Sequence, residues 1–117
     1  MPTTPCIKAP VRRVALGALA VMIAFPSAAD AGDPAAGKVK TRACVTCHGV
    51  DGMSRVPDAP NLAGQIEMYL AQQLRAYRAG KRAHQVMSIV AGTLSDADID
   101  DLAAWYASVR ITVKLPD

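Results

Sequence analysis

The stretch Cys44-Val45-Thr46-Cys47-His48 decides how this sequence folds. It has the form Cys-x-x-Cys-His, which is the signature of covalent haem attachment. Two thiols one helical turn apart can each add to a vinyl group on the same edge of a porphyrin and form thioethers. The histidine that follows then points its imidazole at the iron from one face. The stretch predicts one covalent haem c, anchored by Cys44 and Cys47, with His48 as an axial ligand.

The first 31 residues have the pattern of a secretory signal peptide. Residues 1–13 are basic and carry no acid, residues 14–25 are an unbroken run of apolar and small residues, and Ala-Asp-Ala at 29–31 resembles a cleavage site. We expect cleavage after Ala31 and export of a domain of residues 32–117 to the periplasm. The alternative is a retained anchor, but the run is shorter than the roughly 20 residues of a membrane span. No stable span is therefore expected after cleavage.

The exported domain has little material for a core. Residues 32–117 carry ten basic and nine acidic side chains, so the basic balance of the whole chain lies partly in the signal and does not favour nucleic acid binding. The chain has one Phe and one Trp. Because domains of this size often need a staple, we expect a bound group to fill part of the interior.

Three other interpretations of the motif remain. A thioredoxin-like redox pair requires a βαβ setting, which this sequence does not offer. A zinc site could be drawn from Cys44, Cys47, His48 and His84, but the adjacent pair is an awkward arrangement for structural zinc. The third interpretation is a chance pentapeptide. Haem attachment is favoured because the export signal, the small core and the motif are all typical of an exported protein with a covalently bound haem.

Helical periodicity extends through the exported domain, with no alternating strand pattern. We expect three main helices with loops between them. The first starts at Asp33-Pro34, where an N-cap aspartate precedes a proline at the first helical position, and runs toward Cys44. The second covers about residues 65–79 and ends at Gly80. Its predicted inner face consists of Ile66, Leu70, Gln73, Leu74 and Tyr77.

The third helix has the clearest start, after a predicted loop over residues 81–93. Ser95 is the expected N-cap, and Asp98 lies three residues on, which is the spacing of a capping box. Leu94 before the cap can pack on Ile99. The apolar stripe is Ile99, Leu102, Ala103 and Tyr106. Four acids crowd the helix start: Asp96, Asp98, Asp100 and Asp101. Negative charge at a helix start stabilises the helix, so we interpret these acids as capping groups. The alternative interpretation is a docking patch for a partner.

A second axial ligand has to come from elsewhere in the chain. The candidates are Met53, Met68, His84 and Met87. Met53 follows the attachment site too closely to reach the opposite face, and Met68 on the second helix is typical of core packing. His84 lies among charged residues and is interpreted as a surface side chain. Met87 lies in the predicted loop before the third helix, where the chain can cross the far face, and is the predicted ligand.

The sequence as a whole resembles class I cytochrome c, most of all the small bacterial periplasmic kind whose domains also occur doubled in dihaem cytochromes. The resemblance covers residues 33–109. The matching stretches are CVTCHGVDG (44–52), PNLAGQ (60–65), YLAQQL (69–74), YRAG (77–80), Met87, LSDADI (94–99) and LAAWY (102–106). It implies an all-α fold, with three main helices and loops wrapped around one covalently bound haem, and the first and third helices crossing near Gly37.

The resemblance also implies roles for individual residues. Cys44 and Cys47 would carry the thioethers, and His48 and Met87 would bind the iron from opposite faces. The carbonyl of Pro60 would accept a hydrogen bond from the far nitrogen of His48 and so orient the imidazole. The residues implied to line the haem pocket are Leu62, Tyr69, Leu74 and Trp105.

An iron held by both His48 and Met87 has no open position for a substrate, so we expect an electron carrier rather than an enzyme. The first hypothesis is a periplasmic monohaem carrier between redox protein partners, such as a membrane oxidase or reductase. The alternative is the cytochrome subunit of a periplasmic oxidoreductase complex, for example a flavin- or molybdenum-dependent dehydrogenase, which an exposed apolar patch beside the haem would favour. A third hypothesis is a haem protein whose Met87 does not bind iron and which binds small ligands.

Overall fold

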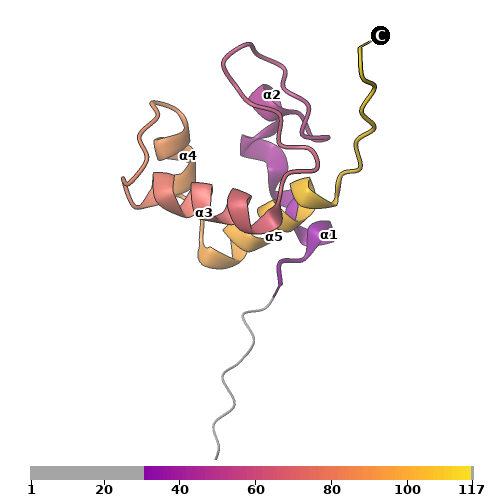
Figure 1. Cartoon of the computed structure of the whole chain (residues 1–117). Coiled ribbons are helices and arrows are strands. Elements are labelled where there is room, and N and C mark those ends of the chain that lie inside the picture. Colours follow the sequence, from indigo (N-terminus) through magenta and orange to yellow (C-terminus); the bar gives the residue numbers. More distant parts are fainter. Residues whose placement is uncertain (1–30, 117) are drawn as a thin grey trace, which may run out of the picture.

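A computed structural model describes residues 31–116 of the chain. Their elements are α1 (Pro34–Lys40), η1 (Thr41–Ala43), α2 (Val45–His48), α3 (Glu67–Arg78), α4 (Met87–Gly92) and α5 (Asp96–Ser108). The described residues contain helices and loops but no strand (Figure 1), which confirms the predicted all-α class. Apart from Ala31, the predicted signal peptide lies outside the described residues. Within residues 31–116, no helix has the length and apolar character that a membrane crossing requires.

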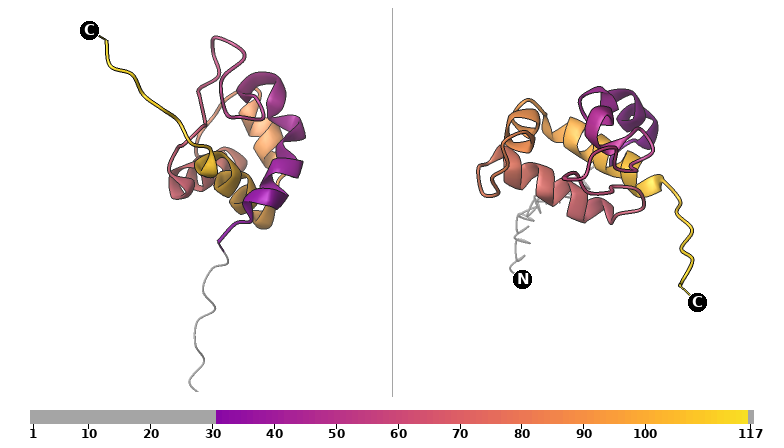
Figure 2. Two further views of the ribbon diagram at one scale, coloured as in Figure 1. Left: turned by 90° about the vertical axis from the view of Figure 1, so that its right-hand side faces the viewer. Right: turned by 90° about the horizontal axis from the view of Figure 1, so that it is seen from above.

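Helix α5 packs against both α1 and α3 (Figure 2). The predicted crossing near Gly37 is confirmed, because a Cβ on Gly37 would meet the backbone of Asp101 in α5. The carboxylate of Asp33 caps α1 by accepting from the backbone N–H of Ala35 at 2.8 Å, as the sequence predicts. The backbone N–H of Asp33 donates to Asp101 Oδ1 at 2.8 Å, and Lys40 Nζ donates to Asp101 Oδ2 at 2.6 Å. Both ends of α1 are therefore attached to one side chain of α5.

The core forms where α3 and α5 meet. The predicted stripe of α5 is confirmed, since all four of its side chains are buried: Ile99, Leu102, Ala103 and Tyr106. Helix α3 contributes Leu70 and Ala71, and Leu74 packs against them. The assignment of Ile66 to the inner face is wrong, because its side chain is 68% exposed. Ile66 is the N-cap of α3, with extended backbone angles, so it does not follow the helical phase.

The predicted loop over residues 81–93 contains α4, which the sequence does not indicate. This helix has six residues, too few for an apolar period to be recognised. Its first turn is held by His84, whose Nδ1 accepts from the backbone N–H groups of Val86 and Met87 at 3.2 Å each. Histidine is not among the usual capping residues. The exposed His84 therefore holds the turn that leads into α4, two residues before the N-cap Val86, and is not a free surface side chain.

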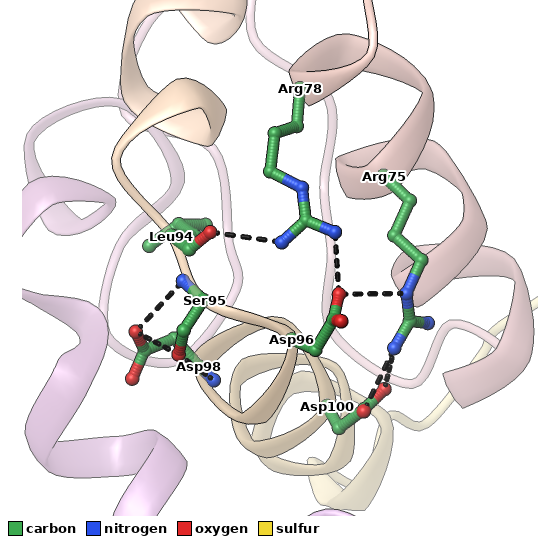
Figure 3. Close-up of polar contacts among 7 residues, drawn as sticks. All are labelled: Arg75, Arg78, Leu94, Ser95, Asp96, Asp98 and Asp100. Atoms are coloured by element: carbon green, nitrogen blue, oxygen red, sulfur yellow. Dashed lines mark hydrogen bonds and ion pairs between the residues drawn. The ribbon is translucent and has the colours of Figure 1, made fainter.

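The acidic start of α5 is bound within the molecule (Figure 3). Ser95 and Asp98 form the predicted capping box, with the Asp98 backbone N–H donating to Ser95 Oγ at 3.1 Å. Arg75 donates to both carboxylate oxygens of Asp100 at 2.8 Å. Arg78 pairs with Asp96 and also donates to the carbonyl of Leu94. These contacts connect α3 to the start of α5 and favour the capping interpretation over a docking patch.

The fourth acid of this cluster, Asp101, and the capping acid Asp98 share one lysine. Lys40 Nζ lies 2.8 Å from Asp98 Oδ1 and 2.6 Å from Asp101 Oδ2. The ammonium group, together with hydrogen bonds from Ser95, holds the pKa of Asp98 well below its usual range. It also lowers the pKa of Asp101, and the two carboxylates raise the pKa of Lys40. This ion triad joins the end of α1 to α5.

Candidate haem site

The attachment motif lies on the short helical segments that follow α1. Cys44 comes after η1 and is the N-cap of α2, and Cys47 lies within α2. The backbone N–H of His48 donates to the carbonyl of Cys44 at 2.9 Å, so the two cysteines lie about one helical turn apart. Both are half-buried thiols that form no disulfide. Gly49 has a φ of 72°, a backbone conformation that favours glycine, and it ends α2 directly after His48.

His48 is held from behind by the loop that follows the motif. Its side chain is buried, and Nδ1 lies 2.8 Å from the carbonyl oxygen of Pro60, the contact that the resemblance implies. A carbonyl only accepts, so Nδ1 carries the proton and Nε2 is left as the nitrogen that can bind a metal. The Pro60 segment is fixed in turn, because Leu62 N–H and Ala63 N–H both donate to the carbonyl of Gly52. The imidazole therefore has a set orientation.

A largely apolar cavity opens in front of His48, between the Pro60 segment, α3, α5 and the start of α4. Of the residues predicted for the site, the cavity is lined by Cys44, His48, Pro60, Leu62, Tyr69, Leu74 and Met87. The cavity has further lining residues that the sequence does not predict for the site: Ala43, Asn61, Gln65, Leu70, Gln73, Tyr77, Arg82, Val90, Leu102, Ala103 and Tyr106. Several of these were recognised only as inner-face or core positions, because a side chain against a cofactor has the same periodicity as one against a core.

Cys47 and Trp105 are not among the residues that line the cavity. Trp105 Nε1 donates to the carbonyl of Val50 at 2.8 Å, and Lys38 Nζ lies 5.2 Å from the centre of its ring. The side chain therefore belongs to the contact of α5 with α1 and with the loop that follows the motif. Successive residues of a helix point about 100° apart, and it is the neighbouring Tyr106 that faces the cavity.

Tyr106 connects α5 to the attachment motif from inside. Its hydroxyl donates to the carbonyl of Gly49 at 3.1 Å, and the side chain is only 3% exposed. Burial raises the pKa of the Tyr106 phenol and keeps it neutral. Burial also raises the pKa of the Cys44 thiol, against a hydrogen bond with Tyr106 that lowers it. The membership of Tyr106 in the apolar stripe of α5 was the available signal for this position.

The four candidates for the second axial ligand lie in different places. Met87 is the first residue of α4 and lines the same cavity as His48. Met53 and Met68 are 43% and 68% exposed, and neither lines the cavity. His84 is exposed and uses Nδ1 to cap α4. Of these four, the described structure brings only Met87 to the cavity.

The cavity fits haem by the chemistry of its donors. Cys44 and His48 reach it from the motif, and the thioether of Met87 reaches it from an element distant in sequence. Imidazole and thioether are ligands that haem iron accepts in cytochromes. The wall between them is mostly apolar, as a flat macrocycle requires.

Comparison with known proteins decides the family. The cytochrome c family model matches residues 35–110. The chain belongs to the cytochrome c family. Members of this family bind haem c covalently, and Cys44 and Cys47 fit the attachment motif. The predicted family, fold and cofactor are thereby confirmed.

This cytochrome c has relatives of two lengths. It is 45% identical to cytochrome c4 of Pseudomonas aeruginosa over 74% of this chain and 43% of the relative. It is 48% identical to cytochrome c-554(548) of Halomonas halodenitrificans, over 67% of this chain and 98% of the relative. The crystal structure of reduced cytochrome c4 from Pseudomonas stutzeri matches with a TM-score of 0.67 and 41% identity, over 74% of this chain and 50% of that one. The chain thus spans about half the length of the cytochrome c4 relatives.

A further relative has a name that points to an enzyme system. The thiosulfate dehydrogenase electron acceptor of Thiomonas intermedia is 40% identical to this cytochrome c over 90% of this chain and 48% of the relative. The family therefore includes electron carriers that are named after an enzyme they serve.

Proposed function

We propose that this cytochrome c is a periplasmic monohaem electron carrier in which His48 and Met87 bind the haem iron from opposite faces. The observation that carries the proposal is the cavity that His48 and Met87 share, although they come from α2 and α4. Export rests on the signal pattern of residues 1–31. With both axial positions taken by protein ligands, the chain offers no site for a substrate, so it is a carrier and not itself an enzyme.

Each part of the site has a separate task. Cys44 and Cys47 attach the cofactor, and Pro60 holds the imidazole of His48 through the contact at Nδ1. The haem supplies a one-electron centre, and thioether ligation and burial both raise its reduction potential. The apolar wall would keep water from the iron, and the hydrogen bonds of His84 at the start of α4 would hold Met87 in place.

The ligand assignment is tested with methionine variants of the purified haem protein. Met87→Ala should lower the midpoint potential and let the ferric protein bind added imidazole or cyanide, because an axial position becomes free. Met68→Ala removes an exposed methionine on the neighbouring helix and should leave the potential and ligand binding unchanged. If the Met68 variant binds imidazole and the Met87 variant does not, the assignment of Met87 is wrong.

A second candidate function is supported by the thiosulfate dehydrogenase electron acceptor among the relatives and by apolar side chains beside the cavity. Tyr69 lines the cavity and is 45% exposed, and Ile66 and Met68 nearby on the same chain segment are each 68% exposed. Exposed apolar groups of this kind are typical of a stable interface. We propose the electron-accepting subunit of an oxidoreductase as the alternative. A stoichiometric, stable complex with one oxidoreductase on native purification favours this alternative, and a monomer favours the free carrier.

A further inference from the structure

Arg82 gives the cavity its one permanent charge. Among the described residues that line the cavity, the other side chains are apolar or neutral polar groups apart from the titratable His48, and none is acidic. The remaining arginines of α3, Arg75 and Arg78, are paired with the acids of α5. Within residues 31–116, Arg82 has no carboxylate partner, so its charge is available to a group inside the cavity.

The turn that ends α3 brings the side chain of Arg82 back against that helix. Gly80 has a φ of 69° and turns the chain, so that the backbone N–H groups of Lys81 and Arg82 both donate to the carbonyl of Ala76. The guanidinium of Arg82 then lies 4.6 Å from the centre of the Tyr77 ring. Its Nη1 donates to Gln73 Oε1 at 2.5 Å. Gln73 and Tyr77 line the cavity one helical turn apart, and together they fix the position of the cation.

A haem carries two propionate carboxylates on the edge opposite its vinyl groups. A carboxylate that enters a low-dielectric site needs a cation and hydrogen-bond donors. A guanidinium is the side chain best shaped for this purpose, since it can present two parallel N–H groups to one carboxylate. Arg82 uses Nη1 for the neutral amide of Gln73 and retains further N–H donors.

We propose that Arg82, held by Tyr77 and Gln73, is the partner of a haem propionate and sets the reduction potential through that contact. This inference rests on the proposed function, because it requires haem in the cavity. A cation beside the propionate offsets its negative charge near the iron. Without the cation, the unbalanced carboxylate stabilises the ferric state, and the reduction potential falls.

The test compares two neighbouring charges in the haem protein. Arg82→Gln should lower the midpoint potential more than the same change at Lys81, because the Arg82 side chain lines the cavity although it is exposed at the surface. Lys81→Gln removes the same charge from the next residue, which is also exposed but does not line the cavity. The shift for Lys81→Gln should be smaller at low salt and should disappear at high salt, because a charge outside the cavity acts on the iron only through screened solvent. Arg82→Lys keeps the charge and should lower the midpoint potential less than Arg82→Gln. If the glutamine variant does not fold, the lysine variant is compared with the wild type instead.

The visible spectrum of each variant separates the two levels of the proposal. A wild-type chain without covalent haem contradicts the proposed function, whatever Arg82 does. Variants that keep covalent haem and the wild-type spectrum, but show equal potential shifts for Arg82→Gln and Lys81→Gln at both salt concentrations, contradict only the role of Arg82. The role of Arg82 is also contradicted if Arg82→Lys lowers the midpoint potential as much as Arg82→Gln does.

Discussion

A Cβ atom placed on Gly37 would lie 1.9 Å from the carbonyl oxygen of Asp101. The backbones of α1 and α5 therefore touch at this crossing, and no side chain fits between them. Since α1 leads through η1 directly to Cys44, the crossing also sets where the attachment motif lies relative to α5.

Gly37→Ala should destabilise the protein by about 1–3 kcal/mol, because the methyl group would have to push two backbones apart. Urea denaturation of the haem protein measures the change. Gly92→Ala is the matched control, since a Cβ at Gly92 meets nothing within 4 Å. That change should be neutral or slightly stabilising. Equal stability of the two variants would show that the crossing tolerates a side chain.

Removal of the histidine cap should loosen α4 and with it Met87. His84→Ala leaves the backbone N–H groups of Val86 and Met87 without their acceptor, at a cost of about 1 kcal/mol. We expect faster binding of added imidazole to the ferric iron, measured by stopped-flow absorbance, because Met87 leaves more often. His84→Asn should restore a slow rate, since an asparagine side chain can also accept from the backbone N–H two residues on. Equally slow binding by the alanine variant and the wild type would contradict a capping role.

Loss of the Tyr106 hydroxyl should leave the buried Gly49 carbonyl without its side-chain donor. Tyr106→Phe is expected to destabilise the protein by about 1 kcal/mol, because the buried Gly49 carbonyl loses the shorter of its two hydrogen bonds and keeps only the one from the Gly52 N–H. Chemical denaturation followed by absorbance measures the effect. Tyr69→Phe is the comparison, because Tyr69 is 45% exposed. A Tyr106→Phe variant as stable as Tyr69→Phe would mean that the hydroxyl contact does not stabilise the fold.

The ion triad of Lys40, Asp98 and Asp101 should stabilise the fold only over a defined pH range. The folded-state pKa of each aspartate is lowered, so the contribution is complete above the ordinary value of 3.8 and is lost as the pH falls further. The pKa of Lys40 is raised, so its contribution is complete below 10.5 and is lost above that value. Lys40→Met should lower the melting temperature near neutral pH.

The difference in melting temperature between Lys40→Met and the wild type should shrink below pH 3.8. Calorimetry at several pH values measures it, and Lys114→Met controls for the loss of a positive charge outside the triad, in the exposed C-terminal segment. A difference that stays constant down to the most acidic pH would mean that the triad does not contribute through its charges.

The features that the sequence predicted correctly are those with local causes. The N-cap of α1 at Asp33, the capping box of Ser95 and Asp98, and the apolar stripe of α5 each depend on residues within two turns of helix. The attachment motif is local too, since its spacing is set by one helical turn. The close approach at Gly37 was available only through the resemblance.

The features that the sequence did not predict depend on contacts between distant elements. The turn before α4 is held by the side chain of His84, and Ile66 is exposed because α3 begins one residue after it. The cavity is lined by Tyr106 and not by the predicted Trp105. Which of the two faces the cavity depends on the rotation of α5 about its axis, and the crossing with α1 fixes that rotation. The return of Arg82 over Tyr77 requires the turn at Gly80.

Proton NMR of the reduced protein tests most directly whether Met87 binds the iron opposite His48. A methionine on ferrous haem iron has its methyl group above the ring, so the ring current moves its resonance far upfield of all other methyl signals. The wild type and Met68→Leu should both show this resonance, and Met87→Leu should lack it. An upfield methionine methyl that persists in Met87→Leu, or is absent from the wild type, would contradict the ligation by His48 and Met87.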